Sequence, residues 1–144
     1  QKSNTPSRHE IMQTKTQHSP IDRRTLAIRG GIALALSLVV NGLIVGIVTA
    51  TDAVQSFQPL AFPPVLFLSA VGAVGATIVY GLLQWRSARP NRLFAVITGV
   101  VLLLSFVPDV TFLPGRPGAT TAGILVLMVM HVTVAGICYA VLTR

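Results

Sequence analysis

The sequence has very little charge for its length. Of its 144 residues only 10% are charged, while 52% are hydrophobic and the mean hydropathy is +0.72. An ordinary soluble domain carries about a quarter charged residues. The deficit argues against a water-soluble globule, and a chain of this length has room for one domain. We therefore expect lipid to be the solvent of most of the chain.

Cysteine and the common catalytic motifs are equally scarce. The one cysteine, Cys138, lies in an apolar run, which excludes a disulfide framework, a C-x-x-C redox pair and a cysteine-based metal site. The sequence has no glycine-rich strand–helix turn that would cradle a phosphate. No nucleophile, base and orienting group converge along the chain. We therefore expect a protein that is not an enzyme and that holds no metal.

Four long uncharged runs are what the sequence does contain. About 20 helical residues cross the roughly 30 Å of hydrocarbon in a bilayer, and a globule this small cannot bury four helices that are apolar on every side. We predict an all-α fold, an integral membrane bundle of four transmembrane helices at 23–144 behind a polar, disordered tail at 1–22. The predicted spans are 27–50, 63–85, 93–113 with a kink at Pro108, and 119–142 with Thr120 or Thr121 as its cap.

The basic residues predict the orientation of this bundle. The net charge is +7, and every lysine and arginine except Arg116 lies on the tail or within a few residues after it, on the connection at 86–92, or at the C-terminus. The positive-inside rule then places both termini in the cytoplasm, with the chain crossing the plasma (inner) membrane several times. We expect no nucleic-acid partner, because that would need a basic stripe on a water-soluble surface. Residues 22–26 are similar to a twin-arginine export signal, but the apolar run that follows is longer than such a signal prefers.

Polar residues inside the spans are the first place to look for function, because each is costly in lipid and tends to face the bundle interior. Four of them fall at similar mid-membrane depth: Asn41, Thr77, Ser105 and His131. One interpretation is a proton-relay or ligand site around His131, because imidazole titrates near neutrality. The other is a packing hydrogen bond between helices, such as Asn41 to His131, and we favour it. Haem or pigment contact through His131 is disfavoured and no cofactor is predicted, since the other histidines lie in the tail.

Two further polar residues belong to the outer interface by their position. Asp109 is the only acidic residue within a predicted span and lies near its outer end, beside Pro108, while Arg116 lies in the connection that follows. With ideal helices Asp109 and His131 differ in depth by about 12 Å. We therefore expect no direct carboxyl–imidazole pair unless the kink at Pro108 lowers Asp109.

Small residues recur every four positions in the first two spans. One stripe comprises Gly42, Gly46 and Ala50, and the other comprises Ser69, Ala73, Thr77 and Gly81. Such stripes allow helices to approach closely. The pattern leaves open whether the neighbour is a helix of the same chain or of another subunit.

The last span resembles a known family. Residues 127–136 read LMVMHVTVAG, and Met130-His131 with the small residues after it resembles the Met-His pattern in the last helix of an uncharacterised family of small bacterial and archaeal four-helix membrane proteins. The layout is similar as well, with a short basic lead, four spans and a proline-containing connection before the last helix. The resemblance implies the four-span fold and no known activity.

Two functional hypotheses follow. The first is a noncatalytic accessory or structural subunit of a larger membrane complex, such as a respiratory or photosynthetic one, because the stripes suit packing and the spans offer no polar pathway. Its partners would be membrane lipids and other membrane-protein subunits or a second copy of the chain. The alternative is a small transporter or channel that uses the mid-membrane polar layer around His131.

Overall fold

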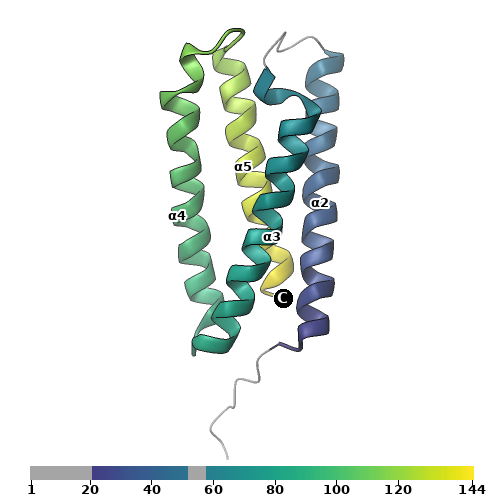
Figure 1. The fold of residues 1–144 in the computed structure, drawn as a ribbon, viewed down its shortest axis with the longest axis vertical. Helices are drawn as coiled ribbons and strands as arrows, with labels where there is room; N and C mark the ends of the chain where they lie inside the picture. The colour runs from purple at the N-terminus through teal and green to yellow at the C-terminus, as the bar shows by residue number, and fades with distance from the viewer. Residues whose placement is uncertain (1–20, 52–57) are drawn as a thin grey trace, which may run out of the picture.

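The computed structural model describes residues 21–51 and 58–144. Within them, four α-helices run up and down in an antiparallel bundle (Figure 1): α2 (Arg23–Ala50), α3 (Phe62–Arg86), α4 (Pro90–Thr111) and α5 (Thr121–Leu142). Two 3-10 turns, η1 (Gln58–Leu60) and η2 (Leu113–Gly115), precede α3 and follow α4. All four helices are long and apolar enough to cross a membrane, which confirms the prediction of four such helices in an all-α fold. The predicted tail lies outside the described residues as far as residue 20.

Local sequence signals account for the helix ends. Pro63 lies in the first turn of α3 and Pro90 in that of α4, where backbone amides have no helical partner. Helix α4 continues past Pro108 to Thr111. Gly118 has a φ of 77° in the turn before α5, a left-handed conformation that favours glycine.

Thr120 caps α5, as its sequence position predicts. Its Oγ1 accepts a hydrogen bond from the Gly123 amide at 3.0 Å. Thr120→Ala leaves that amide without its partner, so the free energy of unfolding in detergent should fall by about 1 kcal/mol. Thr121→Ala, one residue further along and exposed, is the control and should stay within about 0.5 kcal/mol of the wild type. Equal losses in the two variants would contradict the capping role.

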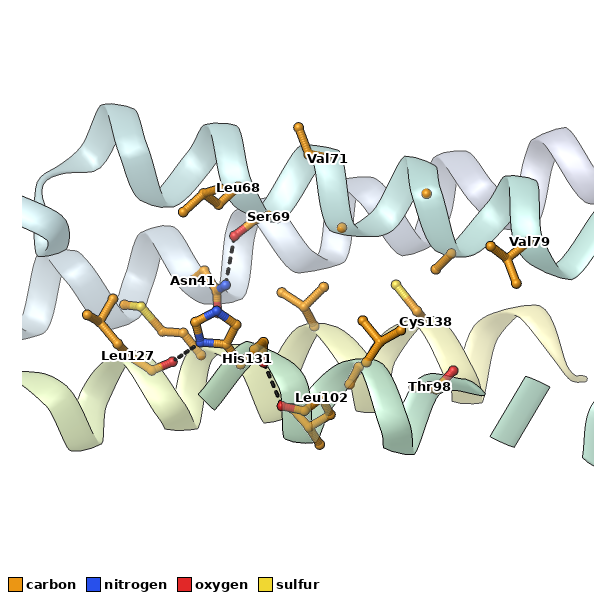
Figure 2. A pocket seen from close by; sticks show the side chains of 18 of the residues that line it. Asn41, Leu68, Ser69, Val71, Val79, Thr98, Leu102, Leu127, His131 and Cys138 are labelled. Atoms are coloured by element: carbon orange, nitrogen blue, oxygen red, sulfur yellow. Dashed lines mark hydrogen bonds between the residues drawn. The ribbon is translucent and has the colours of Figure 1, made fainter. Parts of the chain in front are cut away.

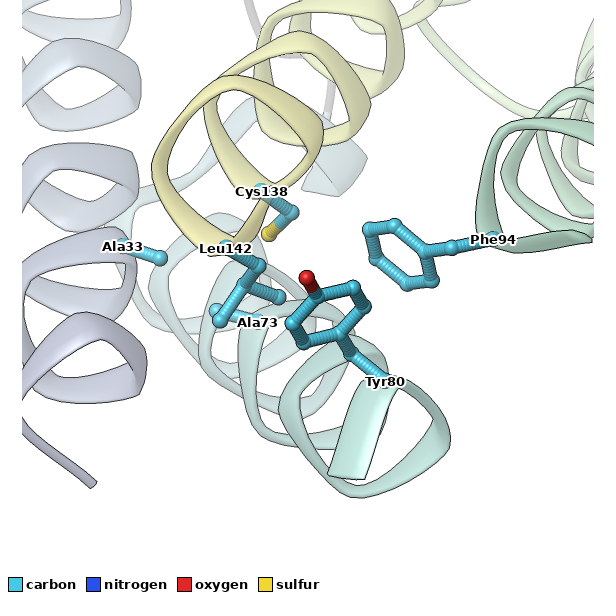
Figure 3. Close-up of a cluster of buried hydrophobic side chains, with 6 residues drawn as sticks. All are labelled: Ala33, Ala73, Tyr80, Phe94, Cys138 and Leu142. Atoms are coloured by element: carbon cyan, nitrogen blue, oxygen red, sulfur yellow. The ribbon is translucent and has the colours of Figure 1, made fainter. Parts of the chain in front are cut away.

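Two buried clusters hold the bundle together. The cluster in Figure 3 lies toward the end that carries the C-terminus and comprises Ala33, Ala73, Tyr80, Phe94, Cys138 and Leu142. The second cluster lies toward the opposite end and comprises Val45, Leu60, Val65, Leu127 and Met130. In the first cluster the Tyr80 and Phe94 rings meet edge to face with centroids 5.0 Å apart. This aromatic contact joins α3 to the start of α4.

The end that carries the C-terminus, here called the basic end, holds every described arginine except Arg116. Arg29 Nη1 donates to the Leu142 carbonyl at 3.2 Å, and Asn91 Nδ2 donates to the Thr143 carbonyl at 3.3 Å. These bonds satisfy carbonyls that the end of α5 leaves without helical partners. Tyr80 Oη donates to Asn91 Oδ1 at 2.8 Å, so the same asparagine links α3 to this group.

Helix α4 is the least enclosed of the four. In its most apolar stretch 11% of the residues are buried, against 28% in α3. Figure 1 shows α4 at the edge of the bundle, joined to α3 at the basic end and standing away from it toward the opposite end. This divergence shapes the site described next.

Candidate functional site

The predicted small-residue stripe on α3 lies in the interior. All four positions are buried or half-buried: Ser69, Ala73, Thr77 and Gly81. A Cβ atom built on Gly30 of α2 would fall 2.5 Å from Thr77 Cγ2, and one built on Gly81 would fall 2.7 Å from Leu26 Cδ2. Glycine at these two positions therefore lets α2 and α3 approach closely.

The predicted stripe on α2 lies beside the interior. Gly42 and Gly46 are half-buried, Ala50 is exposed, and a Cβ on either glycine would have its nearest neighbour at 3.8 or 4.0 Å. The buried face of α2 instead comprises Gly30, Ala33, Ser37, Asn41 and Val45. Small residues occur on several faces of this helix, so their spacing alone did not identify the packed one. From Gly30 to Asn41 the buried positions follow at steps of three, four and four residues, too close to the four-residue steps of the predicted stripe for spacing to separate the two.

Asn41 is buried between α2 and α3. Its Nδ2 donates to Ser69 Oγ at 2.8 Å, as Figure 2 shows. The interhelical partner of Asn41 is thus Ser69, whereas His131 was the partner suggested from the sequence. Asn41 Oδ1 has no hydrogen-bond partner within the described residues. A buried acceptor without a partner carries a desolvation cost of about 1–3 kcal/mol, which marks the atom as a candidate contact for a bound molecule.

The structure brings Asp109 and His131 together, which corrects the expectation from helical depth. His131 Nδ1 lies 3.4 Å from Asp109 Oδ2 and 2.8 Å from the Leu127 carbonyl oxygen. Both Asp109 and Arg116 lie toward the end opposite the basic end, but Asp109 is only 5% exposed and faces the bundle, whereas Arg116 is exposed in the turn after η2. Side chains on a helix lean toward its N-terminus. Because α4 and α5 are antiparallel, the two side chains lean toward each other, which closes part of the predicted separation. The 3.4 Å contact also requires that α4 and α5 do not end at the same depth, as the estimate from helical rise assumed.

These contacts give the two nitrogens of the His131 ring different roles. Nδ1 faces the Leu127 carbonyl and the Asp109 carboxyl oxygen, two acceptors, so it carries the proton. In the neutral ring Nε2 is then an acceptor. Figure 2 shows this second nitrogen on the side of the ring turned away from Leu127. His131 and Asp109 could offer two ligands to a metal, but no group of three ligating side chains occurs within the described residues.

The other two members of the predicted polar layer bond within their own helices. Thr77 Oγ1 donates to the Ala73 carbonyl at 2.8 Å, and Ser105 Oγ donates to the Leu102 carbonyl at 2.7 Å. Thr77 packs against α2 at Gly30, away from His131. The four residues therefore do not form one connected polar group in the described structure.

A cavity of about 480 Å³ lies among α3, α4 and α5 and reaches Asn41 of α2. Most of its walls are apolar. Its half away from the basic end holds Asn41, Ser69 and His131 (Figure 2) together with Ser105 of α4, while Thr98 lies in the other half. Residues on its α3 and α4 walls, such as Leu68, Val71 and Val101, are exposed, so the cavity opens between these two helices. Along α5 it extends from Leu127 to Cys138, about 16 Å by helical rise. Apolar walls with a few polar groups, in a volume of roughly 300–1,000 Å³, are typical of small-molecule sites.

The contact between Asp109 and His131 should be measurable as a coupling free energy between the two side chains in protein stability. A double-mutant cycle with Asp109→Ala and His131→Ala should give an interaction free energy of about 0.6–1.7 kcal/mol in detergent, the range found for polar pairs in membrane proteins. Thr133, two residues along α5, donates its hydroxyl to its own helix at the Val129 carbonyl. The control cycle of Asp109→Ala with Thr133→Ala should be additive within about 0.5 kcal/mol. If the effects of the two substitutions were additive in both cycles, the 3.4 Å contact between Asp109 and His131 would contribute nothing to stability.

Comparison with known proteins extends the resemblance seen in the last helix to nearly the whole chain. Residues 16–144 match the model of a family described as a family of unknown function, DUF6069. Neither a curated protein nor a solved structure matches the chain. The match includes all four helices and the cavity among them. The chain therefore belongs to DUF6069, a family of unknown function.

Proposed function

We propose that this protein is a noncatalytic integral membrane protein that binds a small amphipathic molecule, the size of one lipid chain with its head group, in the cavity among α3, α4 and α5. The observation that carries the proposal is the form of this cavity. It has apolar walls, four polar side chains in one half against Thr98 in the other, and an opening between α3 and α4. In a bilayer that opening faces hydrocarbon, so an apolar molecule would enter sideways from the membrane without crossing water.

The volume of the cavity favours a slender molecule over a helix of another subunit. A transmembrane helix about 30 Å long and 10 Å wide occupies on the order of 2,000 Å³. The cavity offers about 480 Å³. A partner helix could cover the opening but could not enter it.

The interior supports binding more than transport. The polar half of the cavity is separated from the Tyr80–Asn91 hydrogen bond at the basic end by buried residues, among them Ala73, Phe94 and Cys138. A conducting path needs a continuous row of polar groups or water. We place the bundle in the plasma (inner) membrane with both termini cytoplasmic, since the arginines gather at the basic end.

Native mass spectrometry of the protein released from its own membrane tests this function. The expected spectrum shows one adduct of lipid-like mass per chain that persists after loosely attached lipid has been removed. The bare chain as the sole species under the mildest conditions that keep it folded would contradict the proposal.

A second candidate function, an accessory subunit of a larger membrane complex, is favoured by the outward face of α5. Gly136 and Ala140 are exposed and four positions apart, and a Cβ built on Gly136 would meet nothing within 4 Å. Two small residues at this spacing allow another helix to approach closely. Purification in mild detergent tests this candidate: a stoichiometric partner that is lost in Gly136→Phe would support it, and a chain that always migrates alone would contradict it.

A further inference from the structure

We infer that the molecule held in the cavity is a lipid with an uncharged hydroxyl head, and that this hydroxyl lies between Asn41 and His131. The inference rests on the proposed binding function and adds the chemical class of the ligand. It is carried by the hydrogen-bonding capacity that the polar half of the cavity leaves unused.

Asn41 Oδ1 is the first unused group. The residue is 2% exposed and lines the cavity, yet Oδ1 has no partner in the described structure. The amide nitrogen of the same side chain is already donating to Ser69 Oγ. Because the nitrogen is occupied, Asn41 offers the cavity an acceptor.

His131 Nε2 is the second unused group. The proton on Nδ1 faces the Leu127 carbonyl and Asp109, and the ring lines the cavity. Nε2 is therefore an acceptor as well. Ser69 Oγ accepts from Asn41 and keeps its own proton, so it can donate to an oxygen in the cavity.

Two acceptors and one hydroxyl donor select a particular head group. A ligand hydroxyl can donate to Asn41 or His131 and accept from Ser69 at the same time. An ether, an ester or a ketone has no proton to give. A carboxylate or phosphate would bring negative charge toward two acceptors and the nearby Asp109, and the lining, among the residues that the structure describes, includes no lysine, arginine, aspartate or glutamate to balance a charged head.

Binding of paired probes to the full chain in nanodiscs tests the head group. A photoreactive long-chain alcohol and its methyl ether share every apolar contact and differ in the hydroxyl proton. We expect both to label cavity-lining residues, with the alcohol binding about tenfold more tightly, the factor that about 1.4 kcal/mol provides. A fatty acid with the same chain should bind more weakly than the alcohol.

Two variants test which side chain causes the preference for the alcohol over the ether. His131→Phe keeps an aromatic ring without an acceptor, and Asn41→Leu removes the other acceptor. A hydroxyl has one proton, so the variant that removes its acceptor should bring the alcohol toward the ether in affinity while ether binding persists, which also shows that the cavity has stayed folded. A preference that stays unchanged in both variants would contradict the inference. Thr133→Val removes a hydroxyl outside the cavity and should preserve the preference.

The outcomes separate this inference from the function on which it rests. If the wild type binds alcohol and ether equally at the cavity, the hydroxyl head is wrong while lipid binding stands. If no probe labels the cavity, both are wrong. A second probe pair, an alkylated hydroquinone and its dimethyl ether, tests whether the hydroxyl of the ligand is aliphatic or aromatic. For each pair we compare the affinity of the hydroxyl compound with that of its ether. The pair with the larger affinity ratio identifies the type of hydroxyl, and either result supports the inference.

Discussion

Gly30→Ala should destabilise the protein by about 1–3 kcal/mol, the usual penalty for an added carbon in a packed interior. The new Cβ would fall 2.5 Å from Thr77 Cγ2 and 2.8 Å from Thr77 Oγ1. Thr77 is β-branched and its hydroxyl is bonded to the Ala73 carbonyl, so the side chain has little freedom to turn away. The helices would have to separate where α2 and α3 pack most closely. Reversible unfolding in detergent, followed by circular dichroism, measures the loss.

Two further variants test whether the clash with Thr77 causes the loss of stability in Gly30→Ala. Gly31→Ala adds the same methyl group where nothing lies within 4 Å, and it should be neutral or stabilising by up to about 1 kcal/mol. Thr77→Ala in the Gly30→Ala background removes the two closest atoms and should restore most of the lost stability. If Gly30→Ala proved as stable as Gly31→Ala, the close approach of α2 and α3 would be wrong.

Gly75→Phe should lower occupancy of the cavity at least about tenfold, as expected when a ligand must displace or clash with a side chain. Gly75 lines the cavity, and a Cβ there would meet nothing within 4 Å, so the backbone can carry a larger side chain there without a clash at its first atom. Phenylalanine also has a higher helix propensity than glycine, which favours folding. The intensity of the one-to-one lipid adduct in native mass spectra measures the occupancy.

Gly136→Phe is the matched control for this variant. Gly136 is equally open but lies outside the cavity lining, so its replacement should leave the adduct intact. An adduct that weakens equally in both variants would point to nonspecific lipid on the outer surface. Retention of lipid together with loss of a protein partner in Gly136→Phe would instead favour the accessory-subunit function.

Features of the fold that depend on residues close together in the sequence could be predicted from the sequence. Uncharged runs long enough for hydrocarbon predicted four helices, and the turn at 114–118 predicted a cap at Thr120 or Thr121. The packed face of α2 could not be predicted, because that helix is apolar all round and small residues fall on several of its sides. Hydropathy identifies such a helix without showing which way it turns.

The candidate site was predictable only in part. His131 and Asn41 stood out as polar residues in apolar runs, and both line the cavity. Pairing of His131 with Asp109 was missed for two reasons: helical rise locates Cα atoms and not side chains that lean toward the N-terminus of their helix, and the estimate assumed that the two helices end at the same depth. The cavity itself follows from the divergence of α4 from α3, a tertiary feature with no local sequence signal.

Contacts between valine methyl groups and the chain of a bound lipid test binding in the cavity most directly. Val101 lines the cavity and Val39 does not, although the two are 57% and 59% exposed; Val71 and Val132, at 53% and 49%, form a second matched pair. Nuclear Overhauser effects from a protonated lipid in deuterated detergent should be strong at Val101 and Val71 and weak at Val39 and Val132. Equal effects at valines of equal exposure would show that lipid only coats the bundle, and would contradict a binding cavity between α3 and α4.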